Sequence, residues 1–228
     1  MTPQVVTIII QIVVLLFAIS LHEAAHAWMA SRLGDQTARM LGRVTLNPIK
    51  HIDPIGTVLF PLLLALTHLP VFGWARPTPV NTRNFKHIVR DDTLTTLAGP
   101  VSNMLGAIVA LLLLLVIKLS SPVGYQAVGA AVYTISGLEV ADTSLLYPLA
   151  LLLCYAILIN LALDVFNLLP VPPLDGGHIV RNFLPYNLVV IYDRVGMFSL
   201  FLIFFFGGRV IGGIISPAIR FFFHILGY

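Results

Sequence analysis

The sequence predicts an all-α polytopic membrane protein with about five to six transmembrane helices. A re-entrant or strand-containing membrane-associated segment is expected after the first helix. Of the 228 residues, 58% are hydrophobic and only 10% are charged, and the mean hydropathy is +0.94. A soluble domain carries about 25% charged residues, because most of its surface meets water. Lipid must therefore cover many of these side chains.

Long apolar segments lead to the same fold class, because a bilayer core of about 30 Å requires about 20 helical residues. The five strongest candidate spans are about Val5–Ala30, Leu94–Leu119, Leu145–Leu168, Leu188–Phe206 and Val210–Leu226. Two weaker segments are Ile55–Leu69 and Val123–Ile135. We expect all of them to belong to one bundle.

The charges of the loops predict how the spans are oriented. Basic residues gather in residues 31–54 and 71–92, whereas residues 120–144 contain no Lys or Arg. Both basic loops face the cytoplasm if Ile55–Leu69, which Pro61 interrupts, is re-entrant or half-inserted. The N terminus is then outside, the C terminus is inside, and the chain is a multi-pass protein of the cell membrane.

The composition also excludes other classes of protein. The chain has 13 basic and 10 acidic residues, and its formal net charge of +3 is scattered. Nucleic-acid binding requires a clustered basic face, so we expect no nucleic-acid partner. The single cysteine, Cys154, lies in an apolar run and cannot form a disulfide within the chain.

The motif HEAAH, residues 22–26, lies within the first span. His22 and His26 share one face of a helix at this spacing, so both imidazoles can reach one metal ion. Glu23 can reach a water molecule bound to that metal, which is how zinc hydrolases divide the work. Ionisable groups are costly inside a membrane and usually functional, so this motif favours a metal site over a chance pattern.

Zinc usually takes a third protein ligand, and Asp175 is the candidate. It lies in NLLPVPPLDGGH, residues 167–178, just after the inner end of the Leu145–Leu168 span. The prolines break the helix and the glycines allow backbone to pack closely beside a site. The alternative is an ordinary turn with a solvated aspartate.

Together these motifs resemble the site-2 protease family, the intramembrane metalloproteases grouped as M50 peptidases. HEAAH and NLLPVPPLDGG carry the resemblance, and LAGPVSN, residues 97–103, is similar to the family signature A-G-P-x-x-N. Residues 47–57 and 72–77 also resemble its compact members. The matching blocks extend from His22 to His178 and therefore cover most of the chain.

The resemblance implies a zinc metalloprotease that hydrolyses peptide bonds in or near transmembrane segments, as in regulated intramembrane proteolysis. His22, His26 and Asp175 would ligate one Zn²⁺ per chain. Glu23 would activate the zinc-bound water. The substrate would be a single-span membrane protein, cleaved near the cytoplasmic face of the lipid bilayer.

Four further polar residues are candidates for supporting roles at the site. Asn167 matches a motif asparagine that would bind the substrate backbone or steady the oxyanion. Asn103 would satisfy freed backbone groups or orient the site. His178 is either a partner of the site or an interfacial residue, and His51 is a weaker candidate for a catalytic contribution.

The resemblance also suggests membrane-associated strands in the segments Arg43–Asn47 and Gly73–Val80, where strand-favouring residues occur. An exposed edge there could pair with an unwound substrate.

We expect a single membrane-embedded peptidase domain over residues 1–228. Its catalytic core covers about residues 5–180, and two C-terminal transmembrane helices cover about residues 188–226. No sequence remains for the PDZ or CBS modules of larger relatives. The glycine pairs at 207–208 and 212–213 would permit close helix packing or a homo-oligomer.

Two other functions use the same residues. A membrane metal-ion transporter would need further polar residues through the outer half of the bundle, and Leu105–Ile117 and Ile191–Phe206 supply few. A non-catalytic metal-binding scaffold needs no general base, which Glu23 would supply.

Overall fold

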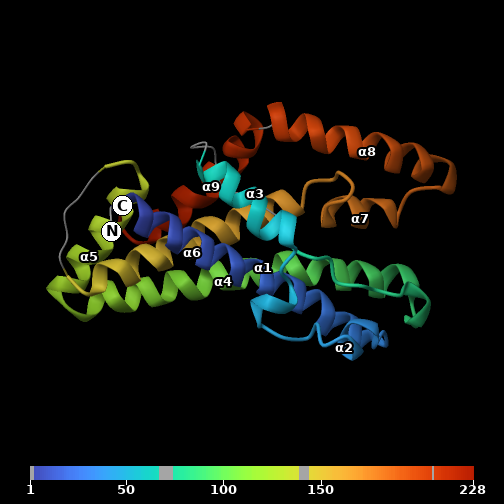
Figure 1. Cartoon of the computed structure of the whole chain (residues 1–228), viewed down its shortest axis with the longest axis horizontal. Helices are drawn as coiled ribbons and strands as arrows, with labels where there is room; N and C mark the ends of the chain where they lie inside the picture. The colour runs from blue at the N-terminus through green and yellow to red at the C-terminus, as the bar shows by residue number, and fades with distance from the viewer. Residues whose placement is uncertain (1–2, 67–73, 139–143, 207) are drawn as a thin grey trace.

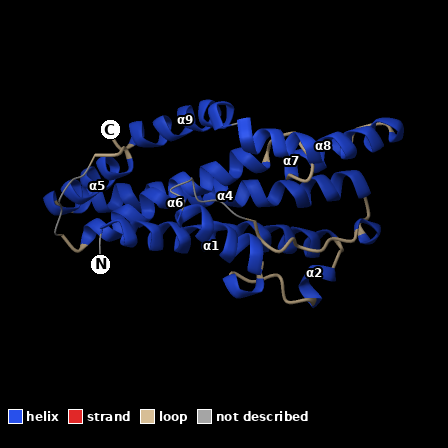
Figure 2. Ribbon diagram, turned by 45° about the horizontal axis from the view of Figure 1, so that its top comes forward, coloured by secondary structure: helices blue, strands red, loops and turns tan. Residues whose placement is uncertain are grey.

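The computed structural model describes residues 3–66, 74–138, 144–206 and 208–228, and helices dominate it (Figure 1). In chain order they are α1 (Pro3–Leu33), α2 (Thr37–Met40), η1 (Pro48–Lys50), η2 (Pro54–Leu59), α3 (Phe60–Leu66), η3 (Thr82–Asn84), α4 (Ile88–Ser120), α5 (Pro122–Ile135), α6 (Leu146–Asn167), α7 (Asp175–Arg181), α8 (Tyr186–Phe206) and α9 (Gly208–Ile225). No strand occurs in these four ranges, as Figure 2 shows. The prediction of an all-helical chain is confirmed.

Three helices are long and apolar enough to cross a membrane within the described ranges: Val5–Leu33, Ile88–Ser120 and Leu146–Asn167. They coincide with three of the five predicted spans. Pro54–Leu64 and Gly212–Ile225 are apolar helices of shorter length. The further crossings therefore stay predictions.

The helices α1, α4 and α6 lie side by side and form the centre of the bundle (Figure 1). Small residues such as Ala107, Ala110 and Ala150 are buried where α4 and α6 meet, so the two backbones approach closely. Larger side chains, among them Leu114 and Ile157, fill the remaining space and are fully buried. This packing sets α4 against α1, which carries the HEAAH motif.

The helices α8 and α9 follow one another from the α7 end of the bundle towards the α5 end in both views (Figures 1 and 2). Phe222 and Phe223 of α9 join the main core, and Tyr228 lies beside Gly129 of α5. The chain therefore ends at the same end of the bundle as α1 begins. An even number of crossings would bring the two ends to one side of a membrane, and the count of five to six crossings stays a prediction.

The segment after α1 differs in part from the sequence-based expectation. Residues 55–66 of the predicted re-entrant segment lie in η2 and α3, whereas residues 67–69 lie outside the described ranges. The expected strands at 43–47 and 73–80 are absent from the described residues, and Gly73 lies outside them. Pro77 and Pro79 explain why no ladder forms at 74–80, because proline has no N–H to donate.

Candidate metal centre

Two histidines of α1 and one aspartate of α7 bring their side chains together inside the protein. His22 Nε2 and His26 Nε2 lie 3.0 Å apart, and Asp175 Oδ2 lies 3.0 Å from the first and 3.5 Å from the second. The spacing of the histidines places both imidazoles on one face of α1. The three residues could hold a single metal ion, since one ligand atom from each lies within 4.8 Å of the others.

The chemistry of this cluster fits a divalent cation such as zinc. Asp175 Oδ2 is buried yet makes no hydrogen bond of acceptable geometry among the described residues. Two imidazole nitrogens and a carboxylate oxygen are a three-ligand set that zinc takes in enzymes.

Neighbouring groups on α4 hold the two imidazoles in the orientation that a metal requires. His26 Nδ1 lies 2.8 Å from the backbone oxygen of Thr95, which can only accept, so Nδ1 carries a proton and the neutral imidazole has its lone pair on Nε2. A metal-ligating histidine usually has such a partner on its other nitrogen. Nothing in the sequence singles out Thr95, because its backbone makes the contact.

Asn103 holds His22 in a similar way. It is fully buried, its amide nitrogen lies 3.2 Å from His22 Nδ1, and its amide oxygen has no partner among the described residues. A flip of the amide exchanges these two atoms. With the oxygen facing His22, the Nδ1 proton is donated to Asn103 and Nε2 is free for a metal. This contact suits the orienting role that was one of two expectations for Asn103.

Gly99 lets α4 approach the cluster closely. A Cβ atom at this position would lie 2.4 Å from His26 Nε2 and 2.6 Å from His22 Cε1. Both distances are far shorter than van der Waals contact, so a side chain cannot fit unless the histidines move. The A-G-P signature contains Gly99, but only the packing of α4 against α1 shows what the glycine does.

Glu23 lies next to the cluster on α1 and is held by the irregular segment that precedes η3. The backbone N–H of Thr78 donates to Glu23 Oε2 over 2.9 Å, and the Thr78 hydroxyl donates to the backbone oxygen of Glu23 over 3.0 Å. The carboxylate is therefore oriented by a residue 55 positions away in the sequence. No feature of the sequence identified Thr78.

Asp35 anchors the same segment at the end of α1. Its buried carboxylate accepts hydrogen bonds from Thr37, from the backbone N–H of Asn81 and from the Asn84 amide. Burial alone would raise the pKa of Asp35, but these donors lower it below its ordinary value. Residues 78–84 are thereby fastened at two places, to Glu23 in α1 and to Asp35 just after it.

A second polar network fixes α7, whose first residue is Asp175, to the beginning of α4. His178 Nε2 donates to Asp92 Oδ2 over 2.8 Å, and Asn182 Nδ2 donates to the same oxygen over 2.7 Å. His178 therefore helps to attach α7 to α4, and it does not belong to the group of residues that could hold a metal. The hydrogen bond to Asp92 raises the pKa of His178 above its ordinary value, although burial acts in the opposite direction.

This network predicts a pH dependence of stability. The folded-state pKa of His178 is raised, so its contribution is complete below the ordinary histidine pKa of about 6.5 and is lost as the pH rises through the raised value. We expect the midpoint of thermal unfolding in detergent to fall over that range more steeply for the natural protein than for His178→Gln, which cannot titrate. Equal pH profiles would contradict this role.

The other two candidate residues, Asn167 and His51, make hydrogen bonds to backbone oxygens of their own segments. Asn167 ends α6, and its amide donates to the backbone oxygen of Leu163 over 2.9 Å. His51 is buried, and its Nε2 lies 2.9 Å from the backbone oxygen of Thr45. His51 does not belong to the group that could hold a metal.

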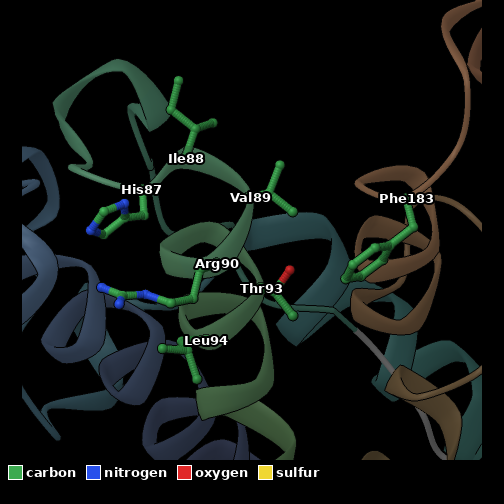
Figure 3. A pocket seen from close by; sticks show the side chains of 7 residues that line it. All are labelled: His87, Ile88, Val89, Arg90, Thr93, Leu94 and Phe183. Carbon is green, nitrogen blue, oxygen red and sulfur yellow. The ribbon is translucent and has the colours of Figure 1, made fainter.

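A pocket of about 590 Å³ opens at the beginning of α4 (Figure 3). Phe183 faces it from the segment after α7, and the α4 side contributes apolar residues such as Ile88 and Leu94. No member of the His22–His26–Asp175 cluster lines it. It is therefore a separate feature of this end of the molecule.

Comparisons with known proteins find relatives that are named zinc metalloproteases. The chain matches the family model of peptidase family M50 over residues 10–206. It is 40% identical to the "Putative zinc metalloprotease YwhC" of Bacillus subtilis over 174 residues, which cover 76% of this chain and 68% of that protein.

More distant relatives carry the same kind of name. The chain is 30% identical to the "Putative zinc metalloprotease Rip2" of Mycobacterium tuberculosis over 162 residues, or 71% of this chain and 52% of the relative. The Rip2 of Mycolicibacterium smegmatis is 33% identical over 97 residues, or 42% of this chain and 36% of the relative. No solved structure gives a significant match. Because the family model covers most of its length, the chain belongs to peptidase family M50.

Proposed function

We propose that this chain is an intramembrane zinc metalloprotease that hydrolyses peptide bonds in or near the transmembrane segments of membrane proteins. The convergence of His22, His26 and Asp175 inside an apolar helical bundle, beside Glu23, carries this proposal. The M50 family and the zinc metalloprotease names of its relatives support the reaction class. One Zn²⁺ per chain would be held by the three residues.

The protein's own side chains divide the chemistry. Bound zinc would act as a Lewis acid that polarises the peptide carbonyl and makes water more acidic. Glu23 accepts a proton from the water that attacks the peptide carbon, and it then gives that proton to the departing amine. Thr78 holds one oxygen of this carboxylate, so the base is oriented before substrate arrives.

The remaining residues support this centre. Thr95 and Asn103 keep the Nε2 lone pairs of His26 and His22 directed at the metal position. The hydrogen bonds of Asp92 hold α7, and so Asp175, against α4. Asn167, eight residues before Asp175, is proposed to bind the backbone of a single-span substrate in this region.

Removal of the metal tests the proposal. Purified protein in liposomes is expected to contain about one zinc ion per chain by elemental analysis and to cleave a model single-span protein. A chelator should abolish cleavage, and added Zn²⁺ should restore it, because the three ligands are useless without the ion. Chelator-resistant cleavage would contradict the proposal, as would zinc transport across the vesicle membrane in place of cleavage.

Thr78 offers a test of the oriented base. Thr78→Val keeps the backbone N–H and the branched shape but removes the hydroxyl that donates to the Glu23 backbone. Loss of one such hydrogen bond is expected to reduce kcat about fivefold, with zinc content unchanged. Thr78→Ser retains the hydroxyl and is the matched control. A Thr78→Val enzyme that matches Thr78→Ser in kcat would show that the contact does not orient the base.

A further inference from the structure

A pocket of about 490 Å³ lies at the end of α1 beyond the metal centre. Trp28, Ser31 and Arg32 of α1 form one side, and Arg39 of α2 with Gly42 and Val44 forms the other. The proposed protease mechanism uses none of these residues. We infer that this pocket binds the phosphate headgroup of an anionic phospholipid, held between Arg32 and Arg39.

The charges at the pocket favour an anion. Both guanidinium groups are exposed, and neither is paired with a carboxylate within the described ranges. Arg32 lies over the Trp28 ring with its Cζ atom 5.4 Å from the ring centroid, and Arg39 Nη1 lies 3.5 Å from Ser31 Oγ. Among the described residues that line the pocket, none is acidic. Two unpaired guanidinium groups match the oxygens of a phosphate.

The surface of α1 that leads to the pocket favours a lipid over a free anion as the ligand. Phe17, Trp28 and Arg32 share one face, because three helical turns separate the first two and one turn separates the last two. Phe17 is 58% exposed and Trp28 is 47% exposed. The face therefore changes from apolar to interfacial aromatic to cationic, in the order of an acyl chain, its ester region and its headgroup.

The length of this face agrees with one leaflet of a bilayer. Fifteen residues separate Phe17 and Arg32, which is about 22 Å of helix, and half of a bilayer with its headgroups is about 20–22 Å. Val44, Leu41 and Met40, around the far side of the pocket, are also exposed, as residues that touch the interface would be. An anionic lipid would thus lie along the helix that carries the metal ligands.

The fluorescence of Trp28 provides a direct test, since the chain contains only two tryptophans. Trp74→Phe leaves Trp28 as the sole reporter. This protein is placed in phosphatidylcholine vesicles that contain a small fraction of a brominated lipid. In one preparation that lipid is brominated phosphatidylglycerol, and in the other it is brominated phosphatidylcholine. We expect brominated phosphatidylglycerol to quench Trp28 more strongly than brominated phosphatidylcholine does. This preference for the anionic lipid should fall about fivefold or more in Arg32→Gln/Arg39→Gln, because each surface cation favours anionic lipid by about that factor.

Matched variants make the outcome decisive. Arg83→Gln/Lys86→Gln removes the same charge from exposed positions elsewhere and should keep the preference, and Arg32→Lys/Arg39→Lys should keep most of it. Equal quenching by the two lipids, or a preference that survives Arg32→Gln/Arg39→Gln, would overturn the inference. An acidic protein segment would then be the ligand to test for the two arginines. A preference erased by inorganic phosphate would also overturn it, because the site would then bind the free ion. None of these readouts depends on proteolysis.

Discussion

Replacement of Glu23 by glutamine is expected to reduce cleavage by about 10²–10⁴-fold, the range by which general acid–base groups accelerate reactions. Glutamine keeps the size of the side chain and can still contact the Thr78 backbone, but it cannot accept a proton from water. Zinc content should remain at about one ion per chain, because Glu23 is not among the three residues that could hold the metal. Turnover of a single-span substrate and elemental analysis on the same preparation measure both quantities.

The control for Glu23→Gln is the same chemical change at an exposed position. Asp193→Asn removes a carboxylate that pairs with Arg181 on the surface, where the contribution of a salt bridge is small. Its cleavage rate should equal that of the natural protein. If Glu23→Gln cleaved at the natural rate, Glu23 would not be the base; if it lost zinc as well, its role would be structural.

The sequence predicts the parts of the centre that depend on local geometry. His22 and His26 are one helical turn apart, so their shared face follows from the helix alone. Asp175 could be proposed because ionisable groups are scarce in so apolar a chain. The contacts of Thr95, Thr78 and Gly99 could not be predicted, because each depends on which helix or loop packs against α1.

The predicted ends of the spans show a similar limit. The apolar stretch predicts that the second strong span begins at Leu94, but α4 begins at Ile88. Asp91 and Asp92 lie in the added turn and are buried, since Asp91 accepts from the His87 backbone and Asp92 from His178 and Asn182. Hydropathy marks such residues as a loop, and only their tertiary partners make them helical.

The arrangement of the last two helices depends on the same kind of long-range contact. Residues 188–206 and 210–226 each approach the length of a crossing, so the sequence alone favours two spans of opposite direction. Phe222 and Phe223 also pack into the core shared by α4, α5 and α6, so part of α9 is buried against the bundle. Composition cannot distinguish a side chain that faces lipid from one that faces this core, because both surroundings are apolar.

Gly99→Ala is expected to lower the zinc affinity by about 100-fold, the upper end of what changes around metal ligands cost. The added Cβ would lie 2.4 Å from the His26 nitrogen that faces the cluster, so that imidazole or the whole of α4 must move. Zinc content after dialysis against buffers of fixed free Zn²⁺ measures the change. Cleavage should fall in proportion to the loss of metal.

The sign of this effect distinguishes the proposed contact from a general helix effect. Alanine stabilises a helix interior by about 1 kcal/mol relative to glycine, so propensity alone would make Gly99→Ala more stable. Gly213→Ala in α9 is the matched control, because among the described residues no atom beyond its own helix backbone lies within 4 Å of its added Cβ. If both variants bound zinc as tightly as the natural protein, α4 would not approach the histidines at Gly99. Loss of zinc in Gly99→Ala alone would mean that the absence of one side chain on α4 is what allows the α1 histidines and Asp175 to meet.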